Sequence, residues 1–214
     1  MELSLLPEWS AFSVFLVAAL AVGISPGPGM LYAVARGIGQ GSGAALVSVL
    51  GLSTGSFINC LIAALGMSAV LAASTLAYDI VRYLGAAYLC YLAYRILRTS
   101  GDGIAVGRLH SEGLGRIYVQ GIITNIINPK SALFYLSFVP QFVDPARGSP
   151  FMQFILLGLI FNVSGNIVNL LVALFFGRIG DWLSQHPRVW QYQRWFTASV
   201  LGGLALHLAL SARR

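Results

Sequence analysis

The residues with the clearest chemical role are Asn128, Pro129 and Lys130. Lys130 is the only lysine among thirteen basic residues, and it lies at the centre of Ile117–Val143, a run with no other charged side chain. A membrane span needs about 20 apolar residues, and a lysine at its midpoint costs about 2.5–3.5 kcal/mol. Each end of the run is roughly 20 Å away along a helix, too far for the lysine stem to reach water. We therefore interpret Lys130 as part of a transport site, where a pocket, a partner or a substrate satisfies the cation.

A second interruption lies about a hundred residues earlier, at Ser25-Pro26-Gly27-Pro28-Gly29 inside the charge-free run Trp9–Ala35. A proline removes a backbone donor and clashes with the preceding helical turn. A single proline kink in a membrane helix is at least as often structural as functional. Two breaks at matching positions, one carrying the sole lysine, favour function. The residues that we expect to meet substrate are Ser25, Pro26, Gly27, Pro28, Asn128, Pro129 and Lys130.

The composition predicts an all-α integral membrane protein. Hydrophobic residues make up 57% of the chain and charged residues 9%, and the mean hydropathy is +0.78. A soluble domain carries about 25% charged residues. The net charge of +6 comes from arginines between apolar runs, so we attribute it to membrane topology and expect no nucleic-acid partner. We predict no cofactor and no metal site, because Cys60 and Cys90 lie in apolar runs without metal-ligand spacing.

Six apolar runs predict six transmembrane helices. Basic residues are unevenly divided among their connections, with eight on the odd-numbered connections and three or four on the other side. The positive-inside rule then places the 99–115 connection in the cytoplasm and both termini in the periplasm. A second polar connection is expected over 178–194. The expected spans are Trp9–Ala35, a helix within 37–78, about Asp79–Leu97, Ile117–Val139, about Phe151–Phe176 and Trp195–Leu210.

The sequence also indicates an internal repeat. Aligning Pro26 with Pro129, and allowing a slip of four residues, places Asn59 on Asn166. An odd number of spans in each half would make the two halves inverted, and secondary transporters of that type bind substrate at interrupted helices near the middle of the membrane. We therefore predict two inverted three-helix repeats with helices one and four broken at the proline motifs. The first half, the connection and the second half are 1–98, 99–116 and 117–214.

Polar and small residues on the predicted helices have two readings. Asn162, Asn166 and Asn169 share one helical face, but membrane amides also hold helices together. Of the three, we assign substrate contact to Asn166. Gly51-xxx-Gly55 permits close helix packing, either within one protomer or in a homodimer. His207 is interpreted as a satisfied or lipid-edge residue in preference to a proton relay.

Five motifs occur in order along nearly the whole length of the chain. They are Ser25-Pro26-Gly27-Pro28, Gly51-Leu52-Ser53-Thr54-Gly55, Gly85-Ala86-Ala87-Tyr88-Leu89, Asn128-Pro129-Lys130-Ser131 and Pro140-Gln141-Phe142. With these motifs the chain resembles the lysine exporter / homoserine-threonine resistance (LysE/RhtB) family of amino-acid exporters. The resemblance implies six spans, an inner-membrane location and proton-driven efflux of amino acids or similar small zwitterions.

One departure from the family refines the expected substrate. Members often carry an acidic residue in the fifth span, whereas this chain reads Asn162-Val163-Ser164-Gly165-Asn166. Without that acid, a neutral substrate is expected, and proton coupling would depend on Lys130, a histidine, the substrate or Asp79. We predict a secondary exporter of a neutral amino acid or related zwitterion, working by alternating access.

Other functional classes remain as alternatives or are set aside. A uniporter, a channel-like protein or a scaffolding membrane subunit is the alternative. A membrane enzyme is not expected, because the spans offer no paired carboxylates, no His/Asp metal cluster and no Ser/His/Asp set.

Overall fold

The computed structural model describes residues 5–25, 27–73, 75–98, 111–184 and 187–210, and every regular element in these ranges is helical. This confirms the all-α prediction. The helices are α1 (Trp9–Ile24), α2 (Pro28–Gln40), α3 (Ser42–Ala73), α4 (Thr75–Arg98), α5 (Leu114–Ile126), α6 (Pro129–Ser137), α7 (Pro150–Ser184) and α8 (Pro187–Leu210), with short 3-10 helices η1 (Val139–Phe142) and η2 (Pro145–Arg147).

Both predicted breaks are present. The first run divides into α1 and α2, which meet at an angle of 51°. The fourth run divides into α5 and α6. Pro28 and Pro129 each begin the second helix of their pair, because a proline has no N–H to lose in the first turn and its fixed φ suits that position. Pro26 lies outside the described residues.

Two predicted boundaries are wrong. The expected polar connection 178–194 is helical on both sides of 185–186, since α7 continues to Ser184 and α8 begins at Pro187. The first expected span ends at Ala35, but α2 includes Arg36 and runs on to Gln40. In both places the sequence prediction treated polar residues as the ends of helices. Arginine and glutamine are good helix formers, so a charge alone does not stop a helix.

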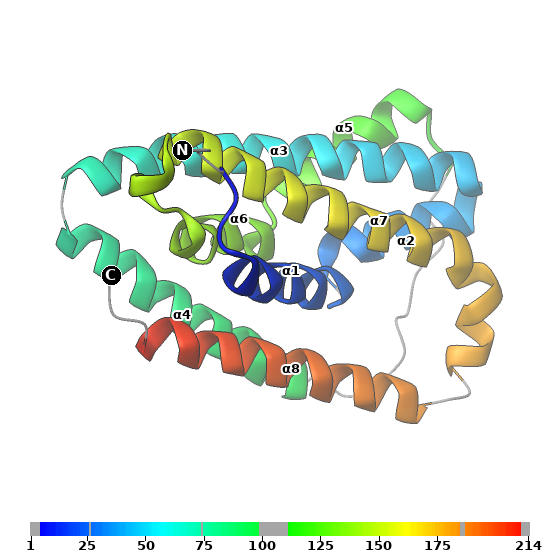
Figure 1. Ribbon diagram of the computed structural model, residues 1–214. Helices are drawn as coiled ribbons and strands as arrows, with labels where there is room; N and C mark the ends of the chain where they lie inside the picture. Colours follow the sequence, from blue (N-terminus) through cyan, green and yellow to red (C-terminus); the bar gives the residue numbers. More distant parts are fainter. Residues whose placement is uncertain (1–4, 26, 74, 99–110, 185–186, 211–214) are drawn as a thin grey trace.

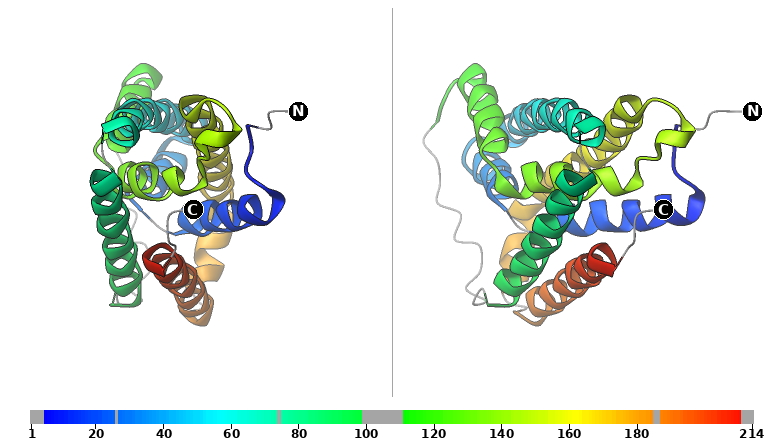
Figure 2. Two further views of the ribbon diagram at one scale, coloured as in Figure 1. Left: turned by 60° about the vertical axis from the view of Figure 1, so that its left-hand side comes forward. Right: turned by 90° about the vertical axis from the view of Figure 1, so that its left-hand side faces the viewer.

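The helices form three layers (Figure 1). α3, α5 and α7 lie on one side, α4 and α8 lie together on the other, and α1 and α6 lie between them. Two further views show the same separation (Figure 2). Some pairings of helices are kept when the two halves of the chain are exchanged: α3 packs on α5 as α7 packs on α1, and α2 packs on α7 as α6 packs on α3. The last helices of the two halves differ, because α4 packs on α6 whereas α8 packs on α1. α1 and α6, in the middle layer, are enclosed by the longer helices.

Glycines bring α3 and α5 into close contact. A Cβ on Gly55 would lie 2.5 Å from the carbonyl oxygen of Ile122, and one on Gly121 would lie 2.8 Å from that of Ser48. Gly51 faces the same helix. The close approach predicted for Gly51-xxx-Gly55 is confirmed within one chain. This glycine face is occupied by α5, and the homodimer stays a prediction.

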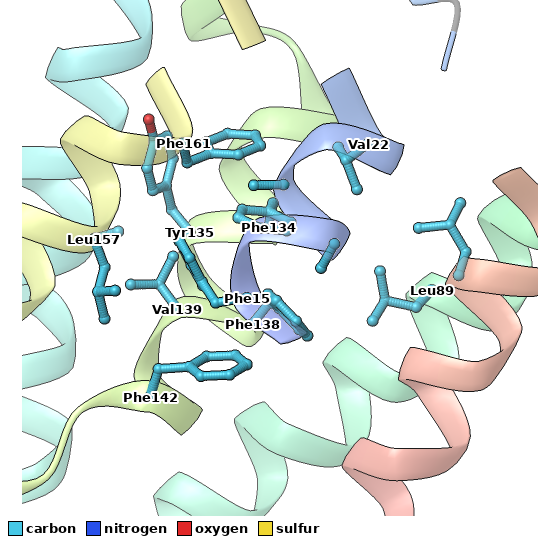
Figure 3. Close-up of a cluster of buried hydrophobic side chains, with 14 of the residues drawn as sticks. Phe15, Val22, Leu89, Phe134, Tyr135, Phe138, Val139, Phe142, Leu157 and Phe161 are labelled. Carbon is cyan, nitrogen blue, oxygen red and sulfur yellow. The ribbon is translucent and has the colours of Figure 1, made fainter. Parts of the chain in front are cut away.

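An aromatic cluster fixes α1 against α6 (Figure 3). The Phe15 ring lies 6.2 Å from the Phe134 and Phe138 rings and 5.2 Å from the Phe142 ring, measured between centroids. Phe134 also stacks on Phe161 of α7 at 4.0 Å. Such pairs contribute about 0.5–1.5 kcal/mol each beyond their buried area. The cluster holds the two halves together beside the breaks.

The distribution of polarity suits a bilayer. Large apolar side chains face outward, including Leu46, Leu50, Ile62, Leu65, Val163, Ile167 and Leu171, while buried polar side chains include Ser48, Ser56, Asn59, Asn125, Asn128, Asn162 and Thr197. Among the described residues, Ser42–Met67 and Pro150–Phe175 are long and apolar enough to cross a membrane, and α1 with α2 counts as a third span if the bent pair is one. α5 and α6 are individually too short, because a span needs about 20 residues. Six spans and their inverted arrangement stay a prediction.

Candidate functional site

Lys130 binds the end of the first broken helix. Its Nζ donates hydrogen bonds to the carbonyl oxygens of Val22, at 3.0 Å, and Ser25, at 2.7 Å. Carbonyls in the last turn of a helix lack helical partners, and the helix dipole places partial negative charge there. The broken end of α1 therefore supplies the stabilisation that the half-buried lysine requires. Ser25, a predicted site residue, contributes its main-chain oxygen.

Gly27 makes room for this ammonium group. A Cβ at Gly27 would lie 3.1 Å from Lys130 Nζ and 3.3 Å from its Cε. Gly27 is extended and has no side chain to cap α2. Pro28 follows as the first residue of α2, and its side chain is exposed. The first break is therefore shaped around a side chain that comes from the other half of the chain.

The second break is satisfied by neutral amides. The Asn128 Oδ1 accepts a hydrogen bond from the Lys130 backbone N–H at 3.0 Å, which caps α6. Asn59 Nδ2 donates to the carbonyl oxygens of Asn125, at 3.0 Å, and Ile126, at 3.4 Å. An asparagine cap stabilises a helix start by about 1 kcal/mol. Asn128 thus positions the lysine as well as lying beside the site, and the Pro129 side chain is exposed.

A polar cavity lies between the two breaks. It leaves about 40 Å³ for the centres of water molecules, enough for a small number of waters. Of the predicted site residues, Asn128, Lys130 and Asn166 line it, whereas Ser25, Gly27, Pro28 and Pro129 lie beside it at the breaks. The sequence prediction missed Asn125, Ser56 and Ser131, which also line the cavity. Asn125 lies one helical turn before the break at Asn128-Pro129. A polar residue at that position in an apolar run was the feature of the sequence that could have identified it.

Hydrogen bonds on the α7 wall leave one oxygen free. Asn162 exchanges two bonds with Ser53 of α3, each 2.9 Å long. Asn166 Nδ2 donates to the carbonyl oxygen of Asn162 at 2.8 Å and to its Oδ1 at 2.6 Å. Within the described part of the chain, the buried Oδ1 atoms of Asn166 and Asn125 have no hydrogen-bond partner. Each unpaired buried acceptor costs about 1–3 kcal/mol.

A charged network joins the end of α2 to the start of α5. Arg36, only 2% exposed, lies 3.1 Å from a Glu112 carboxylate oxygen and donates to Gln120 at 2.7 Å and to Gln40 at 2.8 Å. Gln40 in turn donates to the Glu112 carbonyl oxygen at 2.9 Å. The network ties α2 of the first half to Glu112 and α5 of the second half.

Two residues considered for proton coupling, Asp79 and His207, have side chains outside the described part. In the ranges that are described, no group of three His, Cys, Asp or Glu side chains could hold a metal ion. Among the described residues that line the cavity, Lys130 is the one with an ionisable side chain.

Comparison with known proteins places the chain in a family. The family described as LysE type translocator matches residues 20–212. The homoserine/homoserine lactone efflux protein of Salmonella typhimurium is 29% identical over 82% of this chain and 84% of its own length. The leucine efflux protein of Salmonella choleraesuis is 31% identical over 73% of this chain and 72% of its own length. No solved structure matches significantly. The relatives are transporters and not enzymes, and the chain belongs to the LysE family of membrane translocators.

Proposed function

We propose that the chain is a secondary exporter of a neutral amino acid or related small amine across the inner membrane. The observation that carries this proposal is the Lys130 ammonium group, bound to the carbonyls of Val22 and Ser25 at the edge of a polar cavity. Two of its three N–H bonds have acceptors among the described residues, which leaves the third for a substrate carboxylate. α6 begins at Pro129, directly before Lys130. The start of a helix carries partial positive charge, which also favours binding of a carboxylate.

The relatives' names support the substrate class. Homoserine, homoserine lactone and leucine all carry an α-ammonium group, none has a charged side chain, and the lactone lacks a free carboxylate. Export of such compounds by this chain is our proposal. The cavity fits it, because the described residues that line it include no Asp or Glu that would pair with a cationic side chain.

Transport requires the site to change shape. Substrate must reach the cavity from one side of the membrane and leave on the other, so transport needs the helices around the breaks to separate on each side in turn. We propose that 1–98 and 117–214 act as inverted repeats that rock about this site. The 99–115 connection would lie in the cytoplasm and both termini in the periplasm.

Proton coupling would act through Lys130 or through the substrate itself. Loss of the Lys130 proton would weaken its bonds to the α1 carbonyls, since charge-assisted hydrogen bonds are about twice as strong as neutral ones. Loss of the proton from Lys130 would then release the end of α1 from the second half of the chain. The alternative is an uncoupled uniporter, which would use the same site.

The test is flux from proteoliposomes loaded with labelled neutral amino acids, with and without an imposed pH gradient. We expect saturable efflux that the gradient accelerates in the wild type and that Lys130→Ala abolishes. Saturable flux that does not depend on the pH gradient would indicate a uniporter. Flux that does not saturate with substrate concentration would indicate a channel. Absence of flux for every compound would overturn the proposal and favour a scaffolding subunit.

A further inference from the structure

Two residues that line the cavity with Lys130 each carry an unpaired side-chain oxygen. The Oδ1 atoms of Asn125, in the last turn of α5, and Asn166, in the middle of α7, are buried without a hydrogen-bond partner in the described part of the chain. The Asn125 side chain belongs to a residue only 6% exposed. Because buried acceptors are nearly always satisfied in native proteins, these two oxygens indicate a ligand that donates hydrogen bonds.

The chemistry of that ligand follows from the acceptors. Both are neutral amide oxygens, so a carboxylate would meet lone pairs and gain nothing. An ammonium group has three N–H donors and no acceptor, so it offers a donor to each oxygen. The end of α5 adds partial negative charge at Asn125, whereas the start of α6, beside Lys130, adds partial positive charge.

The backbone of Asn125 is held in place from two directions. Its carbonyl oxygen accepts hydrogen bonds from Asn59 Nδ2 and from the Asn128 backbone N–H, both at 3.0 Å. Asn166 is fixed through its Nδ2 bonds to Asn162. The free oxygens therefore belong to anchored residues on two different helices, which is how a preformed binding site is built.

We infer that Asn125 and Asn166 form the subsite for the substrate ammonium group, with Asn125 as its specificity-determining residue. The inference rests on the proposed function and adds an orientation to it. The substrate lies with its ammonium toward the end of α5 and any carboxylate toward Lys130. A compound that lacks the carboxylate still binds at the amide oxygens, and a compound that lacks the amine does not.

Competition experiments with three matched probes test this subsite. In proteoliposomes that transport labelled leucine, the competitors are leucine, leucine methyl ester, which lacks the free carboxylate, and 4-methylpentanoate, which lacks the amine. If the labelled panel shows homoserine flux instead, the set is homoserine, its lactone and 4-hydroxybutanoate. For the wild type we expect the two amines to compete and the deaminated acid to compete at least tenfold more weakly.

The variants Asn125→Ala and Asn166→Ala should raise the inhibition constants of the two amines by about tenfold or more. This factor corresponds to the loss of one hydrogen bond to a charged group. Neither should change the inhibition constant of the deaminated acid. Asn125→Asp, which retains the acceptor oxygens, should preserve the preference for amines. This last variant separates ammonium binding from a loss of packing.

Two results would overturn the inference while leaving the exporter intact. One is unchanged amine competition in both alanine variants, which would mean that water alone satisfies the oxygens. The other is an equal loss for amine and deaminated competitors, which would mean a structural role. Absence of flux for every amine in the wild type would instead overturn the proposed function, and this inference with it.

Discussion

The two helix breaks are satisfied in opposite ways. The carbonyls at the end of α1 bind a charged group, Lys130 from the second half, whereas those at the end of α5 bind a neutral amide, Asn59 from the first half. The second break also has the Asn128 side-chain cap, and the first has only Gly27. A neutral amide has no net charge with which to attract a substrate carboxylate. The ammonium group of Lys130 attracts such an anion, which then competes with the α1 carbonyls for it. The difference suggests that the second break is a fixed frame and the first is the part that responds to substrate.

The largest effect is expected for Lys130→Met, which keeps the length of the side chain and removes its charge. The carbonyls of Val22 and Ser25 then lose charged donors worth about 1.5–3 kcal/mol each, so flux should fall on the order of 100-fold or more. Initial efflux rates in proteoliposomes, normalised to reconstituted protein, provide the measurement. Wild-type flux in a monodisperse variant would show that the cation is structural and that the two breaks are equivalent.

A smaller effect is expected for Gly27→Ala. The new Cβ would lie 3.1 Å from Lys130 Nζ, so the ammonium must move off the α1 carbonyls. Overpacking of this kind costs about 1–3 kcal/mol, which corresponds to roughly tenfold or more in flux. Gly66→Ala is the matched control, since its Cβ would meet nothing within 4 Å. Equal flux in both variants would contradict the proposed role of Gly27.

Asn59→Ala should change stability more than transport. It leaves the carbonyl oxygens of Asn125 and Ile126 without their amide donor, at a cost of about 1–3 kcal/mol in the free energy of unfolding. A loss of 1 kcal/mol lowers the Tm of a chain of this size by about 2–4 °C. Thermal unfolding in detergent, beside efflux rates of the protein that remains folded, measures both. If flux falls as far as in Lys130→Met while the Tm is unchanged, the second break is not a fixed frame.

The smallest effect is expected for Glu8→Gln, which breaks the 2.8 Å ion pair with Arg147 near the start of α1, outside both breaks. The Glu8 side chain is 72% exposed, and exposed pairs contribute about 0–1 kcal/mol. Thermal unfolding and efflux should both match the wild type within error. A loss of flux here would show that control lies at the ends of the helices, away from the breaks.

Much of the architecture could be predicted from local chemistry. Proline cannot continue a helix without losing a hydrogen bond, so the broken pairs α1/α2 and α5/α6 followed from the sequence. Gly51-xxx-Gly55 identified a close helix contact because only glycine permits it. The error at 178–194 arose because charged residues with long aliphatic stems lie in helices as readily as in loops.

The sequence by itself determined that a lone lysine beside a helix break needs a partner, because an unpaired charge inside an apolar span is costly to bury. Only the tertiary structure decided which groups meet it. The carbonyls of Val22 and Ser25 are more than a hundred residues away from Lys130, and backbone oxygens look alike in any sequence. The same holds for the unpaired oxygen of Asn125, since an amide is satisfied or free according to its neighbours, and its neighbours are set by packing.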